Sequence, residues 1–388
     1  MVLPIVLYKR NPIIPPQSGL CYSLFLQNCA IIYSMASSIR EIGENIKNSP
    51  LFKGDIQYGV PMSEHTTMKV GGPASIFIEP EDDLSLAAAV SILRKNRAPI
   101  FTLGGGSNLV VNDGGIKKAV ISTCRLKGIS VKAKKSFPVQ IEDFPEAKEA
   151  VELVLSAGAG NSFKELNGWC AKYGVQGLEY FSGLPGTCGG AAYMNARCYE
   201  HNFSSLISAV TYLDIDAIPT NLDEQSPFQL EEASLFKRYE MDESEWAYKK
   251  SPFQGKRFII TKLELNVTGL DVYVSGGQSA SPAAGAYIAK KNSFYINDRT
   301  EKGHFRAPSA GSMFKNNHDF GKPSGAIIDE VGLRGLKVGG AQVAPWHGNI
   351  IINTGNATAA DVTALVDRVK QAVSENKGFL LETEVIFV

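Results

Sequence analysis

Several residue types are scarce in this chain of 388 residues, and each scarcity excludes a class of protein. Its six cysteines are scattered and include no C-x-x-C pair, so neither a disulfide scaffold nor a cysteine zinc site is supported. Only five histidines occur, none at metal-ligand spacing, and we expect no metal site. Scattered thiols are typical of a reducing compartment, which predicts a cytoplasmic protein.

An excess of one charge is also missing. The 39 Lys and Arg residues equal the 39 Asp and Glu residues, so the formal net charge is zero. The totals therefore lack the basic excess that is typical of nucleic-acid binding. The one basic cluster of note, Lys132 to Lys135, is more typical of a solvated loop. We expect neither a nucleic acid nor a membrane as partner.

Acidic residues are absent from residues 1–34, which differ from the rest of the chain. The apolar run from Leu20 to Tyr33 is too short to span a bilayer. It also matches a signal peptide poorly, because prolines precede it and Gln27 and Asn28 interrupt it. We predict a loosely ordered extension over 1–34. A natural start at Met35 stays open, and export or organelle targeting is the alternative.

Local patterns predict several regular elements. We expect helices over 37–47, after Asp82 or Asp83, over 162–172, and from Thr358 to Gly378 with a capping-box-like Asp361. Strands are predicted over 74–78, in "KRFIITKLELNV", and in the C-terminal "FLLETEVIFV". Residues 268–300 are rich in glycine, alanine and serine and poorly patterned, which predicts a domain boundary there.

Glycine, by contrast, is abundant in two short stretches. "GGGSN" (Gly104–Asn108) follows a predicted strand, and consecutive glycines let backbone N–H groups converge on a phosphate oxygen. It is neither a P-loop nor a dinucleotide fingerprint, and alone a tight strand connection explains it equally well. "GLPGTCGGAAYMNA" (Gly183–Ala196) is the second stretch. Two such loops favour a long ligand that carries a pyrophosphate.

Seven segments between His65 and Phe387 carry a resemblance to a known family. They are "HTTMKVGGPA", "LGGGSNLVVNDGG", "GLEYFSGLPGTCGGAAYMNA", "APSAGSMFKN", "PSGAIIDEVGLRGLKVGGAQV", "HGNIIIN" and "LETEVIFV". In this order they resemble the UDP-N-acetylenolpyruvoylglucosamine reductase (MurB) family. The resemblance implies an α+β chain with an FAD-binding fold of the vanillyl-alcohol-oxidase type in two subdomains, followed by an α/β substrate-binding domain.

The resemblance also implies domain bounds and an activity. The FAD-binding domain is expected over 35–268 with a split near 120–150, the substrate-binding domain over 269–377, and a C-terminal strand with the active-site glutamate over 378–388. The implied enzyme reduces UDP-N-acetylglucosamine enolpyruvate to UDP-N-acetylmuramate with NADPH, for peptidoglycan synthesis. Hydride passes from non-covalently bound, reduced FAD to substrate C3, and a serine protonates C2. The partner is this small molecule, and we expect a monomer.

The family's catalytic residues map onto three positions. Ser312 in "GSMFKN" matches the proton donor, and Glu384 in "LETEV" matches the active-site glutamate. A carboxylate in so apolar a segment has to be paired or protonated. Lys249 in "YKKSPF" stands where the family usually has arginine, so the charge is kept and the bidentate fork is lost, with Lys250 as the alternative. The alternative is that Ser312 has only a structural role, as a serine in a turn.

Binding residues follow from the same motifs. Tyr248, Lys315 and Asn316 are implied to bind the substrate, since lysine suits a phosphate. We expect Gly339, Gly340 and His347 to serve packing. The residues implied to bind FAD are Thr66, Thr67, Gly104, Gly105, Gly106, Ser107, Asn108, Gly183, Gly186, Gly190 and Asn195.

Three alternatives stay open on the sequence. Some family members add an active-site tyrosine, for which Tyr273 and Tyr287 are candidates. Another FAD-dependent sugar or alcohol oxidoreductase on the same fold would often hold its flavin covalently, for which His65 or Cys188 would be available. A flavin-binding sensor without turnover would be expected to lack Ser312 or Glu384, and both are present.

Overall fold

The computed structural model describes residues 39–222, 232–273 and 279–388. The chain divides after Glu41, and the account below concerns Ile42–Val388. The predicted extension over 1–34 lies outside the described residues, and the helix predicted over 37–47 is present from residue 39 onward. No helix in the described part of the chain is both long enough and apolar enough to cross a membrane.

The first sheet carries the first glycine loop. Its order is β1-β3-β6-β4, with β2 beside β3, and β3 and β4 both run parallel to β6. The predicted helix after Asp82 is present, and Asp82 caps it by accepting from the amide of Ser85 at 2.8 Å. The bounds are β1 Gly54–Gln57, β2 Val60–Pro61, β3 Pro73–Pro80, α2 Asp83–Lys95, β4 Ile100–Leu103 and β6 Ile116–Ser122.

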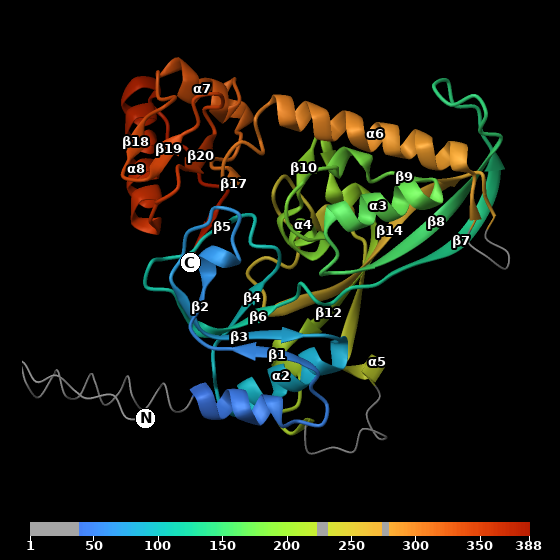
Figure 1. Ribbon diagram of the computed structural model, residues 1–388, viewed down its shortest axis with the longest axis horizontal. Helices are drawn as coiled ribbons and strands as arrows, with labels where there is room; N and C mark the ends of the chain where they lie inside the picture. The colour runs from blue at the N-terminus through green and yellow to red at the C-terminus, as the bar shows by residue number, and fades with distance from the viewer. Residues whose placement is uncertain (1–38, 223–231, 274–278) are drawn as a thin grey trace, which may run out of the picture. The chain divides into compact units, whose positions relative to one another are not determined.

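The second sheet has six strands in the order β13-β12-β14-β8-β7, with β9 beside β14, and all its pairings are antiparallel. Helices α3, α4 and α6 lie on one side of it (Figure 1). Their contact with the sheet forms the largest buried core. The bounds are β7 Ile129–Pro138, β8 Glu149–Gly158, α3 Phe163–Tyr173, β9 Val175–Gln176, α4 Cys188–Met194, β12 Ile207–Asp214, β13 Phe236–Glu240, β14 Phe258–Leu270 and α6 Pro282–Glu301.

Helix α6 shows that the expectation of poorly patterned sequence over residues 268–300 was wrong. It is 20 residues long, begins with a proline in its first turn, and packs against α3. Its buried residues, Ala284, Tyr287, Ile288 and Asn292, follow a helical spacing. The pattern is weak because Ile288 is the only large aliphatic side chain among these four positions.

The third sheet, β17-β20-β19-β18, carries Ser312 at the end of β17, where no strand was predicted, and packs with α7 and α8. The predicted capping box of α8 is confirmed: Thr358 accepts from the amide of Asp361, and Gly378 ends the helix with φ 80°. Gly340 serves packing as expected, because an added Cβ would collide with the backbone of Ala357. The bounds are β17 Ser309–Ser312, α7 Ser324–Glu330, β18 Lys337–Val338, β19 Ala341–Val343, β20 Ile350–Asn353 and α8 Ala359–Lys377.

The predicted C-terminal strand is mostly wrong as regular structure. Only β21, Ile386–Phe387, is a strand, and it pairs in parallel with β5, Leu109–Val110, beside the C-terminus (Figure 1). Upstream, Thr383 forms a single bridge with Phe314. The segment therefore divides its hydrogen bonds between the third sheet and the first glycine loop instead of joining one sheet.

Short elements complete the described chain. They are β10 Arg197–Cys198, β11 His201–Asn202, α5 Glu232–Leu235, β15 Val272–Tyr273, β16 Ser279–Ala280 and the 3-10 turns η1 Met62–Glu64, η2 Glu179–Phe181, η3 Phe203–Leu206, η4 Ile215–Ala217, η7 Glu243–Glu245 and η8 His318–Phe320.

Candidate active site

The two glycine loops lie against each other. A Cβ added at Gly105 would stand 2.5 Å from the Cα of Gly186, so the close approach excludes any side chain there. Gly106 has φ 61°, and its Cβ would collide with the carbonyl oxygen of His65. The glycines of "GGGSN" are therefore required by close backbone contact as well as by backbone conformation.

The first glycine loop presents a row of unused backbone donors. Among the residues that the structure describes, no amide nitrogen from Gly104 to Asn108 donates a hydrogen bond to the protein. Backbone donors in folded proteins are nearly always paired, and consecutive unpaired N–H groups form a concave site for an anion. This loop therefore fits the pyrophosphate of a dinucleotide cofactor.

Side chains beside this loop tie it to the two segments that carry the predicted serine and glutamate. The Thr67 hydroxyl donates to the carbonyl of Ser309 at 2.7 Å, and the Asn108 amide donates to the carbonyl of Glu384 at 3.1 Å. Thr66 is turned away: its buried hydroxyl donates to the carbonyl of Val70 at 3.0 Å. Thr67 and Asn108 thus connect the first glycine loop and its neighbour to the segments of Ser312 and Glu384.

Lys249 and Glu384 form the central contact of the site. Lys249 Nζ lies 2.6 Å from Glu384 Oε1, and the two side chains are only 12% and 11% exposed. The carboxylate that the sequence required to be paired or protonated is therefore paired. The predicted alternative, Lys250, is exposed and does not make this contact. Removing either partner would leave a charge that is largely buried and uncompensated.

The loop of Lys249 is held in an unusual conformation. Lys249 has φ 57°, a left-handed backbone that non-glycine residues seldom adopt. Neighbouring polar side chains restrain it: Gln254 donates to the Lys249 carbonyl at 3.1 Å, and Asn195 donates to the Ala247 carbonyl at 2.8 Å. Asn195 was predicted to bind the cofactor. Both ends of its side-chain amide are instead used within the protein, since the oxygen accepts from the amide of Ser204.

Ser312 has a free hydroxyl at the end of β17. The side chain is half-buried, and its oxygen makes no hydrogen bond to any residue of the described ranges. Gly311, the preceding residue, has φ 77°, a left-handed backbone conformation that glycine adopts without steric cost. Two predicted site segments meet directly after it, because the amide of Glu384 donates to the carbonyl of Met313 at 2.8 Å.

Asn349 holds the backbone that follows Ser312, and the sequence reasoning missed it. The buried Asn349 side chain accepts from the amide of Phe314 and donates to its carbonyl, both at 2.8 Å. Its own carbonyl accepts from the amide of Met313 at 2.8 Å. Asn349 belongs to the motif "HGNIIIN", which could have pointed to it. His347 of the same motif accepts from the Asn349 amide at 3.1 Å.

The predicted substrate residues Tyr248, Lys315 and Asn316 are connected to the site by hydrogen bonds and an ion pair. The amide of Asn316 donates to the hydroxyl of Tyr248 at 3.4 Å, and Lys315 forms an ion pair with Glu382. The Asn316 side chain accepts from the amide of Ser324 at 3.0 Å, which fixes the start of α7. Lys315 and Glu384 also line one cavity of about 210 Å³, together with Tyr193, Met194, Gln254, Thr383, Val385 and Ile386.

Comparison with known proteins bears directly on this arrangement. Residues 303–388 match the family model of the UDP-N-acetylenolpyruvoylglucosamine reductase C-terminal domain, and residues 74–216 match that of an FAD binding domain. The reductase of Treponema denticola is 39% identical over 343 residues, which are 88% of this chain and 96% of that protein. The reductase of Treponema pallidum is 37% identical over 84% of this chain and 92% of that protein.

The chain belongs to the UDP-N-acetylenolpyruvoylglucosamine reductase family.

A solved structure agrees with this membership. The crystal structure of the reductase from Thermus caldophilus matches with a TM-score of 0.59 and 28% identity, and covers 87% of this chain and 99% of that one. The predicted FAD-binding fold is thus confirmed. FAD is the cofactor of this chain. The unused amides of Gly104 to Asn108 are the part of the chain that fits its pyrophosphate.

Two alternatives for this reductase lose support. Cys188 is fully buried, its thiol donates to the carbonyl of Gly158 at 3.0 Å, and burial raises its pKa to about 12, so it suits covalent flavin attachment poorly. Tyr287 is buried, stacks on Phe144 and donates to Asp143 at 2.7 Å, away from the predicted catalytic residues. The side chain of Tyr273 lies outside the described residues.

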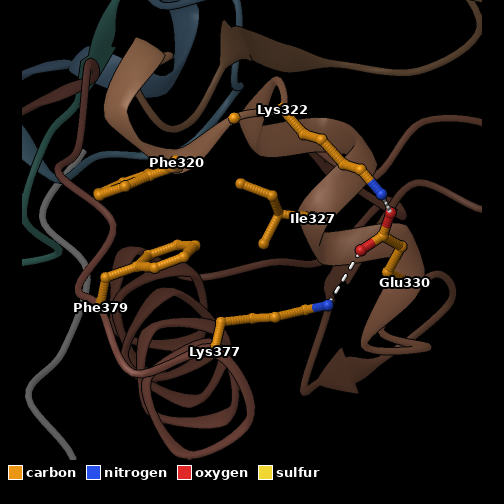
Figure 2. A pocket seen from close by; sticks show the side chains of 7 residues that line it. Phe320, Lys322, Ile327, Glu330, Lys377 and Phe379 are labelled. Atoms are coloured by element: carbon orange, nitrogen blue, oxygen red, sulfur yellow. Dashed lines mark hydrogen bonds and ion pairs between the residues drawn. The ribbon is translucent and has the colours of Figure 1, made fainter.

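A second cavity, of about 270 Å³, lies elsewhere in the C-terminal region. Figure 2 shows Phe320 stacked on Phe379, with ring centroids 3.8 Å apart, and both lysines that line the cavity directed at Glu330. None of the predicted site residues lines it. Its charges are satisfied within the third sheet and its helices.

A change at Gly105 tests the contact between the glycine loops. Gly105→Ala is expected to lower the affinity for FAD about tenfold or more, because the added methyl group forces apart two stretches of backbone. The measurement is the ratio of FAD to protein after gel filtration, followed by titration with FAD. Gly168→Ala is the matched control, since Gly168 lies in α3 with no atom within 4 Å of an added Cβ. Equal FAD affinity in both variants would contradict the role of Gly105.

Proposed function

We propose that this reductase converts UDP-N-acetylglucosamine enolpyruvate to UDP-N-acetylmuramate, with NADPH as reductant and non-covalently bound FAD, in cytoplasmic synthesis of peptidoglycan precursors. One observation supports it above the others. Glu384, the partner of Lys249, is hydrogen-bonded to Asn108 of the first glycine loop, and the strand of Ser312 is hydrogen-bonded to Thr67, whose amide donates to Gly106 of that loop. We propose a monomer, with the predicted domain bounds of 35–268, 269–377 and 378–388.

The substrate's chemistry sets what these residues have to do. Its double bond is a vinyl ether conjugated with a carboxylate, and FAD, when bound and reduced, supplies the hydride that C3 accepts. Negative charge then develops on C2 and on the carboxylate. The protein has to stabilise that charge and deliver one proton to C2, so that the product gains a hydride and a proton in total.

Ser312 is our proton donor. A serine hydroxyl is a weak acid, but the carbon of an enolate-like anion is strongly basic, so correct placement is the main requirement. The hydroxyl has no competing protein acceptor among the described residues, and the backbone after it is held by Asn349 on both sides of Phe314. A proton given to C2 has to be replaced from solvent, which the half-exposed position allows.

Lys249 is our electrostatic stabiliser. Its ammonium group lies in a largely water-excluded position, where a charge acts more strongly on a developing anion than it would in water. Glu384 keeps this ammonium group in place and compensates its burial before substrate binds. Lysine carries a point charge where the family usually has the fork of arginine, so Glu384 and the strained loop take over part of the orientation.

Flavin absorbance tests the function directly. The purified protein is expected to be yellow, to lose its 450-nm band (about that wavelength for a flavin) on adding NADPH without oxygen, and to regain it on adding the enolpyruvyl sugar nucleotide. Colour that NADPH bleaches and the sugar nucleotide does not restore would refute the assignment. Release of free FAD on denaturation separates this enzyme from a covalent oxidase.

Ser312→Ala tests the proton donor. Reduction by NADPH is expected to stay nearly unchanged, while reoxidation by substrate slows by about 10²-fold or more, since general acid catalysis contributes about that factor. Stopped-flow absorbance resolves the two half-reactions. Ser309→Ala, on the same strand, is the matched control. Equal losses in both half-reactions would sink the role of Ser312.

Asn349→Ala tests how that serine is positioned. Loss of two backbone hydrogen bonds at Phe314 is expected to slow reoxidation by substrate about tenfold and to lower the melting temperature. Asn353→Ala is the control, because Asn353 is equally buried but bonds the carbonyl of Met68 at 3.2 Å. If both variants lose stability alike and reoxidise alike, Asn349 is only structural.

A further inference from the structure

The hairpin β10–β11 brings an arginine to the site that no motif predicted. Cys198 pairs with His201, so Tyr199 and Glu200 alone form the turn, and both have positive φ, 47° and 68°. Two-residue hairpin turns of this kind are usually built from glycine, asparagine or aspartate. Tyrosine and glutamate adopt the conformation at a cost, which persists only where the surroundings impose it.

Helix α6 imposes this conformation. The Tyr199 hydroxyl donates to Asp298 Oδ2 at 2.6 Å, and its ring packs on that of Tyr295 with centroids 4.7 Å apart. Lys302 pairs with Asp298 at 2.8 Å and lies over the Tyr199 ring. Hydrogen bonds from Lys302 and, to a smaller extent, from Tyr199 lower the pKa of Asp298, so this carboxylate is ionised at neutral pH. The hairpin is therefore a fixed support for the residues on β10.

From this support Arg197 reaches the Tyr248 ring. Its Cζ lies 5.9 Å from the ring centroid, and Lys249 Nζ lies 5.8 Å from the same centroid. The Tyr248 hydroxyl accepts from the amide of Asn316. One exposed tyrosine thus joins Arg197, the Lys249 loop and the segment of Lys315 and Asn316 into a single rim.

The ion pairs of this rim differ in which partner is exposed. In the inner pair, Lys249 and Glu384 are equally shielded, at 12% and 11%. In the outer pairs the cation is sheltered and the carboxylate is not: Arg197 is 29% exposed against 87% for Glu200, and Lys315 32% against 73% for Glu382.

Ion pairs with so exposed a carboxylate contribute little to stability, so an incoming anion can displace the carboxylate at small cost. Arginine presents a planar fork that matches phosphate oxygens, and its charge-assisted hydrogen bonds are among the strong ones. Arg197 pairs with the exposed Glu200, whereas the shielded Glu384 is paired with Lys249.

We propose that Arg197 binds a diphosphate group of the sugar-nucleotide substrate, opposite Lys315 across Tyr248, and exchanges Glu200 for phosphate when substrate binds. The inference rests on the proposed function for the identity of the substrate. The residue that determines affinity for the nucleotide part is thus carried by the hairpin and not by a glycine loop.

UDP, uridine and NADPH serve as probes of the FAD-loaded enzyme. Arg197→Ala is expected to raise the Kd for UDP about 10- to 100-fold, as the loss of charge-assisted hydrogen bonds predicts, and to leave binding of uridine unchanged. Glu200→Gln removes the same ion pair and is expected to bind UDP at least as tightly as the unaltered enzyme. Arg257→Ala, which breaks the exposed pair with Asp216, is the matched control.

Three outcomes would overturn the proposal. An unchanged Kd for UDP in Arg197→Ala removes it. Equal weakening in Glu200→Gln would show that the pair only supports the hairpin. A raised KM for NADPH with unchanged UDP binding would assign the arginine to the reductant's diphosphate instead. FAD content and melting temperature show that each variant is folded. Reoxidation of the unaltered enzyme by the enolpyruvyl sugar nucleotide tests the proposed function separately, so the two can fail independently.

Discussion

The ion pair between Lys249 and Glu384 is the interaction on which the rest of the site depends. It joins the loop of Lys249 to the C-terminal segment, and both charges are largely withdrawn from water. Two buried charges are tolerated only while they compensate each other, so each restrains the segment of its partner. The C-terminal segment is restrained further along its length, because the amide of Ile386 donates to the carbonyl of Asn108 at 3.0 Å. Hydrogen bonds and this ion pair therefore hold the first glycine loop, the strand of Ser312 and Glu384 in fixed positions relative to one another.

The neighbouring cations are more exposed than the lysine of this pair. Lys249 is 12% exposed, Arg197 29% and Lys315 32%, and all three are paired with a carboxylate. An elongated anion whose carboxylate enters first would meet the least exposed cation there and the more exposed ones with its diphosphate. On our proposals, the same arrangement separates charge stabilisation during the reaction from binding of the nucleotide. The left-handed backbone conformations at Lys249 and in the β10–β11 turn position the cations that serve these two roles.

Much of the fold followed from local signals, and the exceptions have a physical cause. Helix ends at Asp82, Ser162 and Thr358 were predictable, because a cap depends on residues within one turn. Helix α6 was missed, since its buried face holds alanine, tyrosine and asparagine beside a single isoleucine, which gives a weak apolar pattern. The C-terminal strand was predicted at full length because its alternation is regular, whereas its hydrogen-bond partners belong to two different parts of the chain.

The sequence by itself determined the family, the two glycine loops and the identity of Ser312, Lys249 and Glu384 as candidates, because each lies within a short contiguous motif. Only the tertiary structure decided that Lys249 rather than Lys250 meets Glu384, and that Glu382 turns outward to Lys315. It alone placed Asn349 beneath Phe314 and Arg197 over Tyr248. These roles arise from contacts between segments far apart in the chain, and no local pattern records which distant surface a side chain will meet.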